Sequence, residues 1–278
     1  MRVGSSNDGQ TIHEFRVIPT PQNFDEGMEK LIQLSNEVKN GFNYEKCAGG
    51  ITGVLNREKN MLAKSPHLTD WVDKPIKRML SDALQTEIFL ENDSALVGLG
   101  EAVFGAGKGY RLVTYITIST GIGGVRIVDG KIDVNIYGFE PGHQIIDADG
   151  SIYPGFNPEN TGDSKGEFES LASGFAIAKR WGKLPFDLND EGAWEHIHWL
   201  IAQGLCNTIL HWSPEIVVLG GGVSESGKLD LEKIKNHLRT VLTVFPDLPV
   251  IRKAELNDLS GLYGAIAYLS SLKNNASV

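Results

Sequence analysis

A short acidic and amide triplet is the first group of residues in this chain that could carry chemistry. Glu91, Asn92 and Asp93 follow the apolar run 88–90 and precede a helix-compatible segment, 94–104. A carboxylate at the end of a strand can act as a general base that takes a proton from a hydroxyl group. An Asp at a strand-to-helix junction is, however, most often an N-cap that satisfies free backbone N–H groups. Spacing alone favours the capping interpretation of Asp93.

Two glycine-rich turns follow strand-like runs and could bind phosphate. The first, Thr120-Gly121-Ile122-Gly123-Gly124, follows an alternating segment, and the second, Gly220-Gly221-Gly222, follows a fully apolar one. Backbone N–H groups in such turns can face a phosphate group. The first could equally be a tight hairpin, and the second a packing point between a strand and a helix. Their joint occurrence favours nucleotide contact for at least one of them.

A third group of polar residues could bind hydroxyl groups. Glu140 and His143 lie in a Gly/Pro loop, and Glu169 follows at the start of a helical pattern. Carboxylates and imidazole can accept hydrogen bonds from the hydroxyl groups of a polar ligand. A histidine in such a loop is frequently a surface residue, and Glu169 could lie on a solvated helix face. From spacing alone, this structural interpretation is favoured.

Composition excludes several classes of protein. The formal net charge is −9, which disfavours nucleic-acid binding because phosphate backbones require a basic face. No apolar run approaches the ~20 residues of a membrane span. The two cysteines, Cys47 and Cys206, form neither a disulfide framework nor a zinc pattern. We therefore predict a protein of the reducing cytoplasm that binds neither nucleic acid nor membranes.

Strand-like and helical segments alternate along the chain, which is typical of an α/β fold. A hairpin is expected over residues 1–20 and a boundary near Glu91. The other main expectations are helices over 24–38, 71–84 (with Pro75 in the first turn), 168–181, 191–212 and 229–242, and strands over 47–54, 113–119 and 216–219.

Taken together, these motifs resemble the ROK family of bacterial sugar kinases and repressors. The resemblance covers nearly the whole chain in the right order. Its parts are Glu91-Asn92-Asp93, Gly100-Glu101-Ala102-Val103-Phe104-Gly105-Ala106-Gly107, Ser119-Thr120-Gly121-Ile122-Gly123-Gly124, Asp129-Gly130-Lys131, Gly142-His143, the segment 214–224 and the segment 259–266. No single motif is specific, but their joint occurrence is.

The resemblance implies an ATP-dependent, glucokinase-type enzyme that phosphorylates a hexose to its 6-phosphate with Mg²⁺. Asp93 would be the general base and Asn92 would bind sugar hydroxyls. The sugar pocket would be completed by Glu140, His143 and Glu169; the nucleotide would contact Thr120, Gly121, Gly123, Gly221 and Gly222.

The implied fold is the two-domain, actin-like (ribonuclease H-like) ATPase fold. A small domain would comprise residues 1–91 with the C-terminal helix 259–278, and a large domain residues 92–258. The resemblance also implies a homodimer. The family's repressors carry an additional DNA-binding domain, for which this chain has no room.

Two departures from the family pattern matter. Family kinases begin with a strand that carries an Asp-x-Gly-Gly-Thr phosphate loop, whereas Met1-Arg2-Val3-Gly4 looks like the residues directly after it. The family's Cys-x-Cys-x-x-x-x-Cys zinc cluster is also missing, because Ser151 to Phe168 contains no cysteine. We therefore predict no structural zinc.

Two alternatives follow from these departures. The chain could be a non-catalytic sugar-binding pseudokinase, or an N-terminally truncated gene model of the kinase. A nicotinamide-dependent dehydrogenase is disfavoured, because Gly121-x-Gly123 does not match the required Gly-x-Gly-x-x-Gly spacing.

Overall fold

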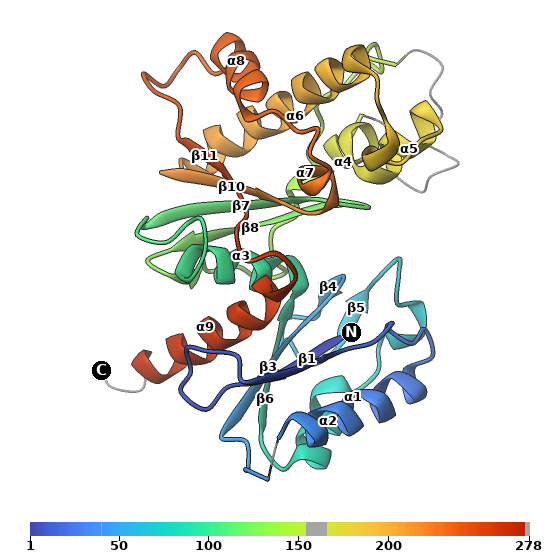
Figure 1. The fold of residues 1–278 in the computed structure, drawn as a ribbon, viewed down its shortest axis with the longest axis vertical. Helices are drawn as coiled ribbons and strands as arrows, with labels where there is room; N and C mark the ends of the chain where they lie inside the picture. Colours follow the sequence, from blue (N-terminus) through green and yellow to red (C-terminus); the bar gives the residue numbers. More distant parts are fainter. Residues whose placement is uncertain (40, 154–165, 276–278) are drawn as a thin grey trace. The chain divides into compact units, whose positions relative to one another are not determined.

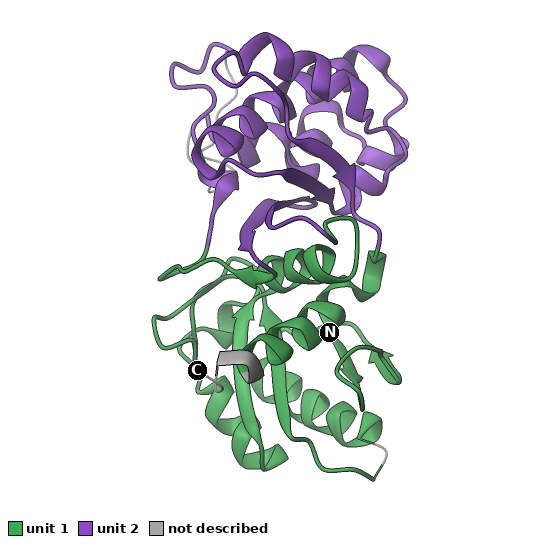
Figure 2. Cartoon of the chain, turned by 90° about the vertical axis from the view of Figure 1, so that its left-hand side faces the viewer, with its two compact units in different colours: residues 1–108, 130–138, 256–278 green, residues 109–129, 139–255 purple. Residues whose placement is uncertain are grey.

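The chain divides into two compact units, coloured separately in Figure 2. The computed structural model describes residues 1–39, 41–153 and 166–275. Unit 1 comprises residues 1–108, 130–138 and 256–278, and unit 2 comprises residues 109–129 and 139–255. The domains expected from the sequence ended at Glu91 and Asp258. The compact units instead place residues 92–108 with the N-terminal part, because the helix in this segment packs on the C-terminal helix.

Apart from the short strand at Lys131–Ile132, the strands in the described part of unit 1 form two-stranded sheets. β1 (Arg2–Ser5) and β2 (Glu14–Val17) form the antiparallel hairpin that the sequence predicted. β4 (Val54–Leu55) and β5 (Leu62–Lys64) form a second antiparallel pair. β3 (Lys46–Ile51) and β6 (Glu87–Asn92) are parallel, with Gly50 opposite Glu91. The acidic triplet therefore begins at the carboxyl end of a parallel pair.

The described part of unit 1 contains four helices, of which the first two contribute to a separate apolar core. They are α1 (Phe24–Val38), α2 (Ile76–Leu84), α3 (Asp93–Val103) and α9 (Ser260–Asn275), with short 3-10 turns η1 (Thr69–Trp71) and η5 (Asn257–Leu259). Trp71 lies edge-on to Phe24 and directly over Gly27, where a Cβ atom would lie 2.1 Å from the indole ring. The core residues around them include Met28, Leu62, Ile76, Leu80, Ile88 and Leu90.

The prediction of one helix over residues 71–84 was wrong at its start. The chain leaves η1 at Trp71, passes Asp73 in the left-handed region (φ 59°) and enters α2 only at Ile76, after Pro75. Proline lacks the N–H that a continuous helix would use, and it restricts the preceding residue to extended conformations. Pro75 therefore precedes α2 and does not lie in its first turn.

α3 and α9 pack together at two glycines (Figure 1). A Cβ atom on Gly100 would lie 2.3 Å from the Ser260 carbonyl oxygen, and one on Gly264 would lie 1.7 Å from the Leu96 carbonyl oxygen. Backbone therefore contacts backbone at this crossing. Because α3 begins at Asp93, the crossing fixes the helix that carries the first candidate site residues.

Unit 2 is built on a mixed sheet in the order β11-β10-β7-β8. β7 (Leu112–Ile118) is parallel to β10 (Ile216–Gly220), which is parallel to β11 (Val250–Lys253). β8 (Ile122–Val128) returns antiparallel to β7, and the short β9 (Lys131–Ile132) belongs to unit 1. Every residue of β10 is buried, which explains its uninterrupted apolar sequence.

Helices complete unit 2. α6 (Glu191–Trp212) has the bounds that the sequence predicted, and Asp190 caps it by accepting a hydrogen bond from the Ala193 amide. α8 (Leu231–Val241) packs with α6 over strand residues such as Ile118, Val217 and Leu219. The remaining helical segments are η2 (Pro141–His143), α4 (Phe168–Ala172), α5 (Gly174–Trp181), η4 (Pro185–Asp187) and α7 (Gly222–Glu225).

The single helix predicted over residues 168–181 is broken at Ser173. Ser173 is extended and caps α5 by accepting from the Ala176 amide. The break lets the Gly174 amide donate to the Ser119 carbonyl at 2.6 Å. In the part of the chain that the structure describes, none of the helices combines the length and apolar composition needed to cross a membrane.

Candidate functional site

Asn92 ends β6 and caps α3. Its side-chain oxygen accepts from the Ala95 amide at 3.1 Å, and its side-chain nitrogen donates to the Gly53 carbonyl at 3.1 Å. The cap that the sequence analysis weighed for Asp93 is therefore supplied by Asn92. Asp93 becomes the first residue of the helix, and its carboxylate accepts from the Ser94 amide at 2.8 Å.

Asp93 lies in a confined position. A Cβ atom on Gly50 would lie 2.9 Å from the Asp93 Cα atom, so only glycine lets the end of β3 approach the start of α3 this closely. Burial raises the pKa of Asp93, and hydrogen bonds from the Ser94 amide and the Thr52 hydroxyl offset part of this shift. A raised pKa makes the ionised carboxylate a stronger proton acceptor. Asp93 therefore has the chemical character of a general base.

The contacts of Glu91, unlike those of Asp93, indicate a role in stabilising the fold. It is 3% exposed and forms an ion pair with Lys59, and its other carboxylate oxygen accepts from the Asn92 amide at 3.0 Å. The triplet thus divides into a buried ion pair, a helix cap and a carboxyl with a raised pKa. Sequence spacing could not rank these three residues, because all of them suit a strand-to-helix junction.

The first glycine turn is a tight hairpin between β7 and β8. Ile118 pairs with Ile122, and the Ser119 amide donates to the Gly121 carbonyl at 2.8 Å. The first amides of α5 hold this turn from one side, with Phe175 donating to the Thr120 carbonyl at 3.2 Å. The side chain of Thr120 is left exposed. Gly123 lies within β8, opposite Thr117.

Glu169, on α4, is bound to this hairpin. Its carboxylate accepts from the Ile122 amide at 2.5 Å. A Cβ atom on Gly121 would lie 2.4 Å from the same carboxylate oxygen. A side chain at position 121 would therefore displace the Glu169 carboxylate from this position, a role of the glycine that the sequence did not reveal.

The second glycine turn lies beside the first, at the carboxyl end of β10. Gly221 has φ 84°, and a Cβ atom there would lie 2.6 Å from the Ile118 carbonyl oxygen, so packing alone requires glycine. At Gly222 a Cβ atom would meet nothing closer than 3.9 Å. This backbone is open to a ligand, and ligands of α/β proteins bind outside the carboxyl ends of strands.

Glu140 precedes η2 and His143 is its last residue, and η2 packs against the start of β8. A Cβ atom on Gly142 would lie 2.1 Å from the Ile122 carbonyl oxygen. Both Glu140 and His143 are exposed, and the charges of Glu140 and Glu169 act on the His143 ring. Unit 2 therefore brings the three predicted hydroxyl-binding residues together around the β7–β8 hairpin.

The structure adds Glu167, which sequence reasoning missed. Its carboxylate lies 2.9 Å from the His143 Nδ1 atom. Partial burial alone would lower the pKa of His143, but the bond to Glu167 and the charges of Glu167, Glu169 and Glu140 raise it overall. The available signal was the Glu-x-Glu spacing of Glu167 and Glu169, which places both carboxylates at the start of α4.

The predicted site residues are distributed between the two units. Asn92 and Asp93 lie in unit 1, and the other eight lie in unit 2: Thr120, Gly121, Gly123, Glu140, His143, Glu169, Gly221 and Gly222. Among residues 1–39, 41–153 and 166–275, no group of three or more His, Cys, Asp or Glu side chains is arranged to hold a metal ion. Part of the segment from Ser151 to Phe168, in which the sequence lacks the zinc cysteines, lies outside the described residues.

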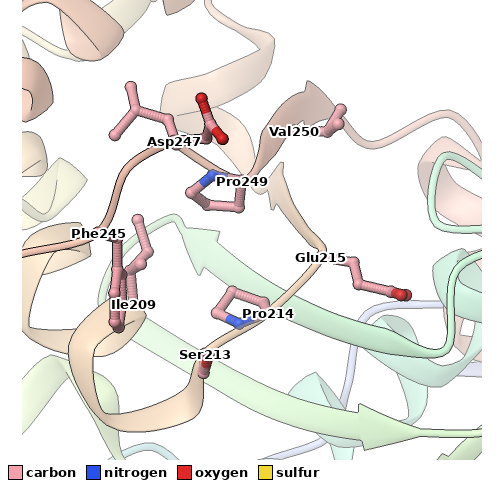
Figure 3. Close-up of a pocket in the computed structure, with 9 residues that line it drawn as sticks. Ile209, Ser213, Pro214, Glu215, Phe245, Asp247, Pro249 and Val250 are labelled. Carbon is pink, nitrogen blue, oxygen red and sulfur yellow. The ribbon is translucent and has the colours of Figure 1, made fainter.

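A separate hollow of about 310 Å³ lies in unit 2 at the amino-terminal end of the parallel strands, where β10 and β11 begin (Figure 3). The two glycine turns lie at the other end of these strands. Apolar residues and two carboxylates line the hollow together: Ile209, Ser213, Pro214, Glu215, Phe245, Asp247, Leu248, Pro249 and Val250. No predicted site residue lines it, so it does not belong to the candidate site.

Comparison with known proteins identifies the family. A family model described as the ROK family matches residues 4–271. The chain belongs to the ROK family. The resemblance that the motifs carried is thereby confirmed.

Among curated relatives, the chain is 34% identical over 208 residues to a putative fructokinase of Bacillus subtilis. This match covers 72% of this chain and 67% of the relative. It is 27% identical over 233 residues to a glucokinase of Thermotoga maritima, with coverage of 73% and 71%. A xylose repressor of Bacillus spizizenii is 28% identical over 214 residues, 71% of this chain and 53% of the repressor.

Solved structures are similar over nearly the whole chain. A ROK hexokinase of Thermus thermophilus has a TM-score of 0.80 and 27% identity, with 96% of this chain and 94% of that chain covered. A ROK glucokinase of Streptomyces griseus, solved with glucose and AMPPNP, has a TM-score of 0.77 and 22% identity, with 95% and 93% covered. The predicted α/β, two-domain actin-like ATPase fold is confirmed.

Proposed function

We propose that this protein is an ATP-dependent sugar kinase that transfers the γ-phosphoryl group to the 6-hydroxyl of a hexose. The observation that carries the proposal is Asp93, a carboxyl with a raised pKa at the first position of α3. Phosphoryl transfer to an alcohol needs a base at the attacking hydroxyl, and otherwise depends on positioning and charge neutralisation. The relatives named fructokinase and glucokinase support a sugar as the substrate.

In this proposal Asn92, Glu140, His143 and Glu169 bind the sugar hydroxyls. Glu169 already accepts from the Ile122 amide, so one carboxylate would contact both the sugar and the β7–β8 hairpin. This bond fixes the orientation of Glu169 before a ligand arrives. Preorganised groups lose less conformational freedom on binding than flexible ones do.

Thr120, Gly121 and Gly123 would contact the phosphates of ATP, and Gly221 and Gly222 would lie against the adenosine. The exposed Thr120 and the open backbone at Gly222 fit such a ligand. Mg²⁺, when bound with ATP, would supply neutralisation of the phosphate charge.

The test is an ADP-release assay with a panel of hexoses and amino sugars, on the wild type and Asp93→Asn. Removal of a general base lowers kcat by roughly 100- to 10,000-fold. We expect this loss in Asp93→Asn, with the affinity for sugar changed by less than about threefold. Asp25→Asn is the matched control, because Asp25 also lies in the first turn of a unit 1 helix. Undiminished turnover in Asp93→Asn would refute the role of Asp93.

A second candidate is a non-catalytic sugar-binding protein. The xylose repressors among its relatives favour it. A bound sugar raises the melting temperature of a protein by mass action whether or not turnover occurs. A sugar that raises the melting temperature without ADP release would therefore support this candidate against the kinase. The homodimer and the absence of structural zinc remain predictions.

A further inference from the structure

The His143 ring has one occupied and one open nitrogen. Its Nδ1 atom lies 2.9 Å from a Glu167 carboxylate oxygen. The Glu167 side chain is 9% exposed, whereas that of His143 is 52% exposed. The pair therefore joins a buried carboxylate to an imidazole that faces outward.

Glu167 is itself fixed by the backbone around it. Ile145 and Glu167 form an antiparallel bridge, and the Phe168 amide donates to the Gln144 carbonyl at 2.9 Å. The amides of Ile146 and Asp147 both donate to the Gly166 carbonyl, at 2.9 and 3.1 Å. These bonds clamp the segment that follows His143 to the segment that precedes α4. The carboxylate is therefore attached to a rigid support.

An ionised carboxylate accepts hydrogen bonds and donates none. The hydrogen of a neutral His143 ring must then lie on Nδ1, which leaves the Nε2 lone pair free to accept. A carboxylate that accepts from one ring nitrogen in this way sets the tautomer and orientation of a histidine. Free imidazole side chains in water favour the opposite tautomer, with the hydrogen on Nε2.

We propose that Glu167 is a positioning residue, which fixes His143 with Nδ1 protonated so that Nε2 accepts a hydrogen bond from a substrate hydroxyl. The identity of the hydroxyl compound as a sugar rests on the function proposed above. The orientation of the ring is independent of that function, because it follows from the hydrogen bond between His143 and Glu167.

The direct test is ¹⁵N NMR of the histidine side chains in the full chain, with no sugar, at about pH 9, well above the ordinary histidine pKa. The chain has seven histidines. The signals of the His143 ring are identified as those that are missing from the spectrum of His143→Gln. We expect a lone-pair-type Nε2 shift for His143 in the wild type and a shift toward the N–H type in Glu167→Leu. A wild-type ring with its hydrogen on Nε2 would overturn the proposal, even if Glu167→Leu does not fold.

The functional test separates KM from kcat. Some hydrogen bonds to a substrate hydroxyl are equally strong in the ground state and the transition state. The loss of such a bond raises KM and leaves kcat unchanged. In Glu167→Leu we expect the KM for sugar to rise about tenfold, with kcat within about twofold. Glu167→Gln, whose amide oxygen can still accept from Nδ1–H, should recover most of this loss.

Glu195→Gln is the matched control. Glu195 forms a carboxylate–imidazole pair with His237, also 2.9 Å long and also in unit 2, but outside the candidate site. It should leave the KM for sugar unchanged. Unaltered KM and unaltered tautomer in a folded Glu167→Leu would refute the proposal. A wild type that turns over no sugar would refute the proposed function alone, since the NMR result would still decide the role of Glu167.

Discussion

Replacing Gly264 with alanine should separate α3 from α9. The new Cβ atom would lie 1.7 Å from the Leu96 carbonyl oxygen, whereas ordinary contacts begin at 3.4 Å. Backbone atoms of both helices form this contact, so no side chain can rotate to relieve it. The helices would have to move apart by about 1.7 Å at the crossing.

Such a displacement is costly because packing energy falls steeply with distance. A gap of 0.5–1 Å already forfeits roughly a quarter to a half of the dispersion attraction across an interface. Overpacking of a close contact typically costs about 1–3 kcal/mol, and backbone-to-backbone contact places Gly264→Ala at the upper end. We expect a loss of about 3 kcal/mol in the free energy of unfolding, and a melting temperature lower by roughly 10 °C for a unit of this size.

The assay is urea unfolding followed by the fluorescence of Trp71, measured with the four tryptophans of unit 2 replaced by phenylalanine. Gly261→Ala is the matched control on the same helix. Its Cβ atom would meet only a Val97 methyl carbon at 3.6 Å, an ordinary contact, so the better helix propensity of alanine should stabilise the protein by up to about 1 kcal/mol.

The two variants therefore differ in sign. A Gly264→Ala protein as stable as the wild type, or more stable than Gly261→Ala, would refute the inferred backbone contact. Since α3 begins at Asp93, the displacement should also lower kcat in Gly264→Ala but not in Gly261→Ala.

Two further predictions concern unit 2. Burial and the nearby charge of Lys233 lower the pKa of His198. The Nε2 atom of this ring accepts a hydrogen bond from the Asp230 amide. The ring is therefore neutral in the folded protein, and at acidic pH it takes up a proton when the protein unfolds. The contribution of the neutral His198 ring to the free energy of unfolding is complete above about pH 6.5 and is lost as the pH falls. The loss is at most about 1.4 kcal/mol at pH 5.5. Urea titrations should show a flatter pH dependence in His198→Gln, and equal slopes would contradict this. In Gly121→Ala the Cβ atom would displace the Glu169 carboxylate, 2.4 Å away. We expect a several-fold rise in the KM for sugar, which an unchanged KM would exclude, with the exposed Gly182→Ala as a control.

The sequence predicted the elements whose signals are local. The bounds of α6 were correct because Asp190 precedes an apolar pattern that continues without interruption to Trp212. The hairpin of β1 and β2 followed from its turn residues. The break at Ser173 could not be predicted, because it depends on a bond between Gly174 and Ser119, fifty-five residues earlier in the chain.

The same limit applies to the candidate site. The types and spacing of residues indicated Asp93, but could not assign the helix cap to Asn92 or the ion pair to Glu91. Glu167 was missed because its partner, His143, lies 24 residues earlier in the chain. Tertiary contacts also explain Gly121 and Gly221 through packing, which pattern reasoning had interpreted through phosphate alone.

The two-stranded sheets of unit 1 have a consequence for handling the protein. Among the described residues, neither β1–β2 nor β3–β6 has a third strand beside it. Open strand edges present unpaired backbone groups to other chains and promote edge-to-edge aggregation. Charged residues such as Arg2, Arg16 and Lys46 on these strands oppose such pairing. Salt screens the repulsion between like charges on the strand edges of two molecules. Concentrated samples should therefore aggregate sooner at high salt than at low salt.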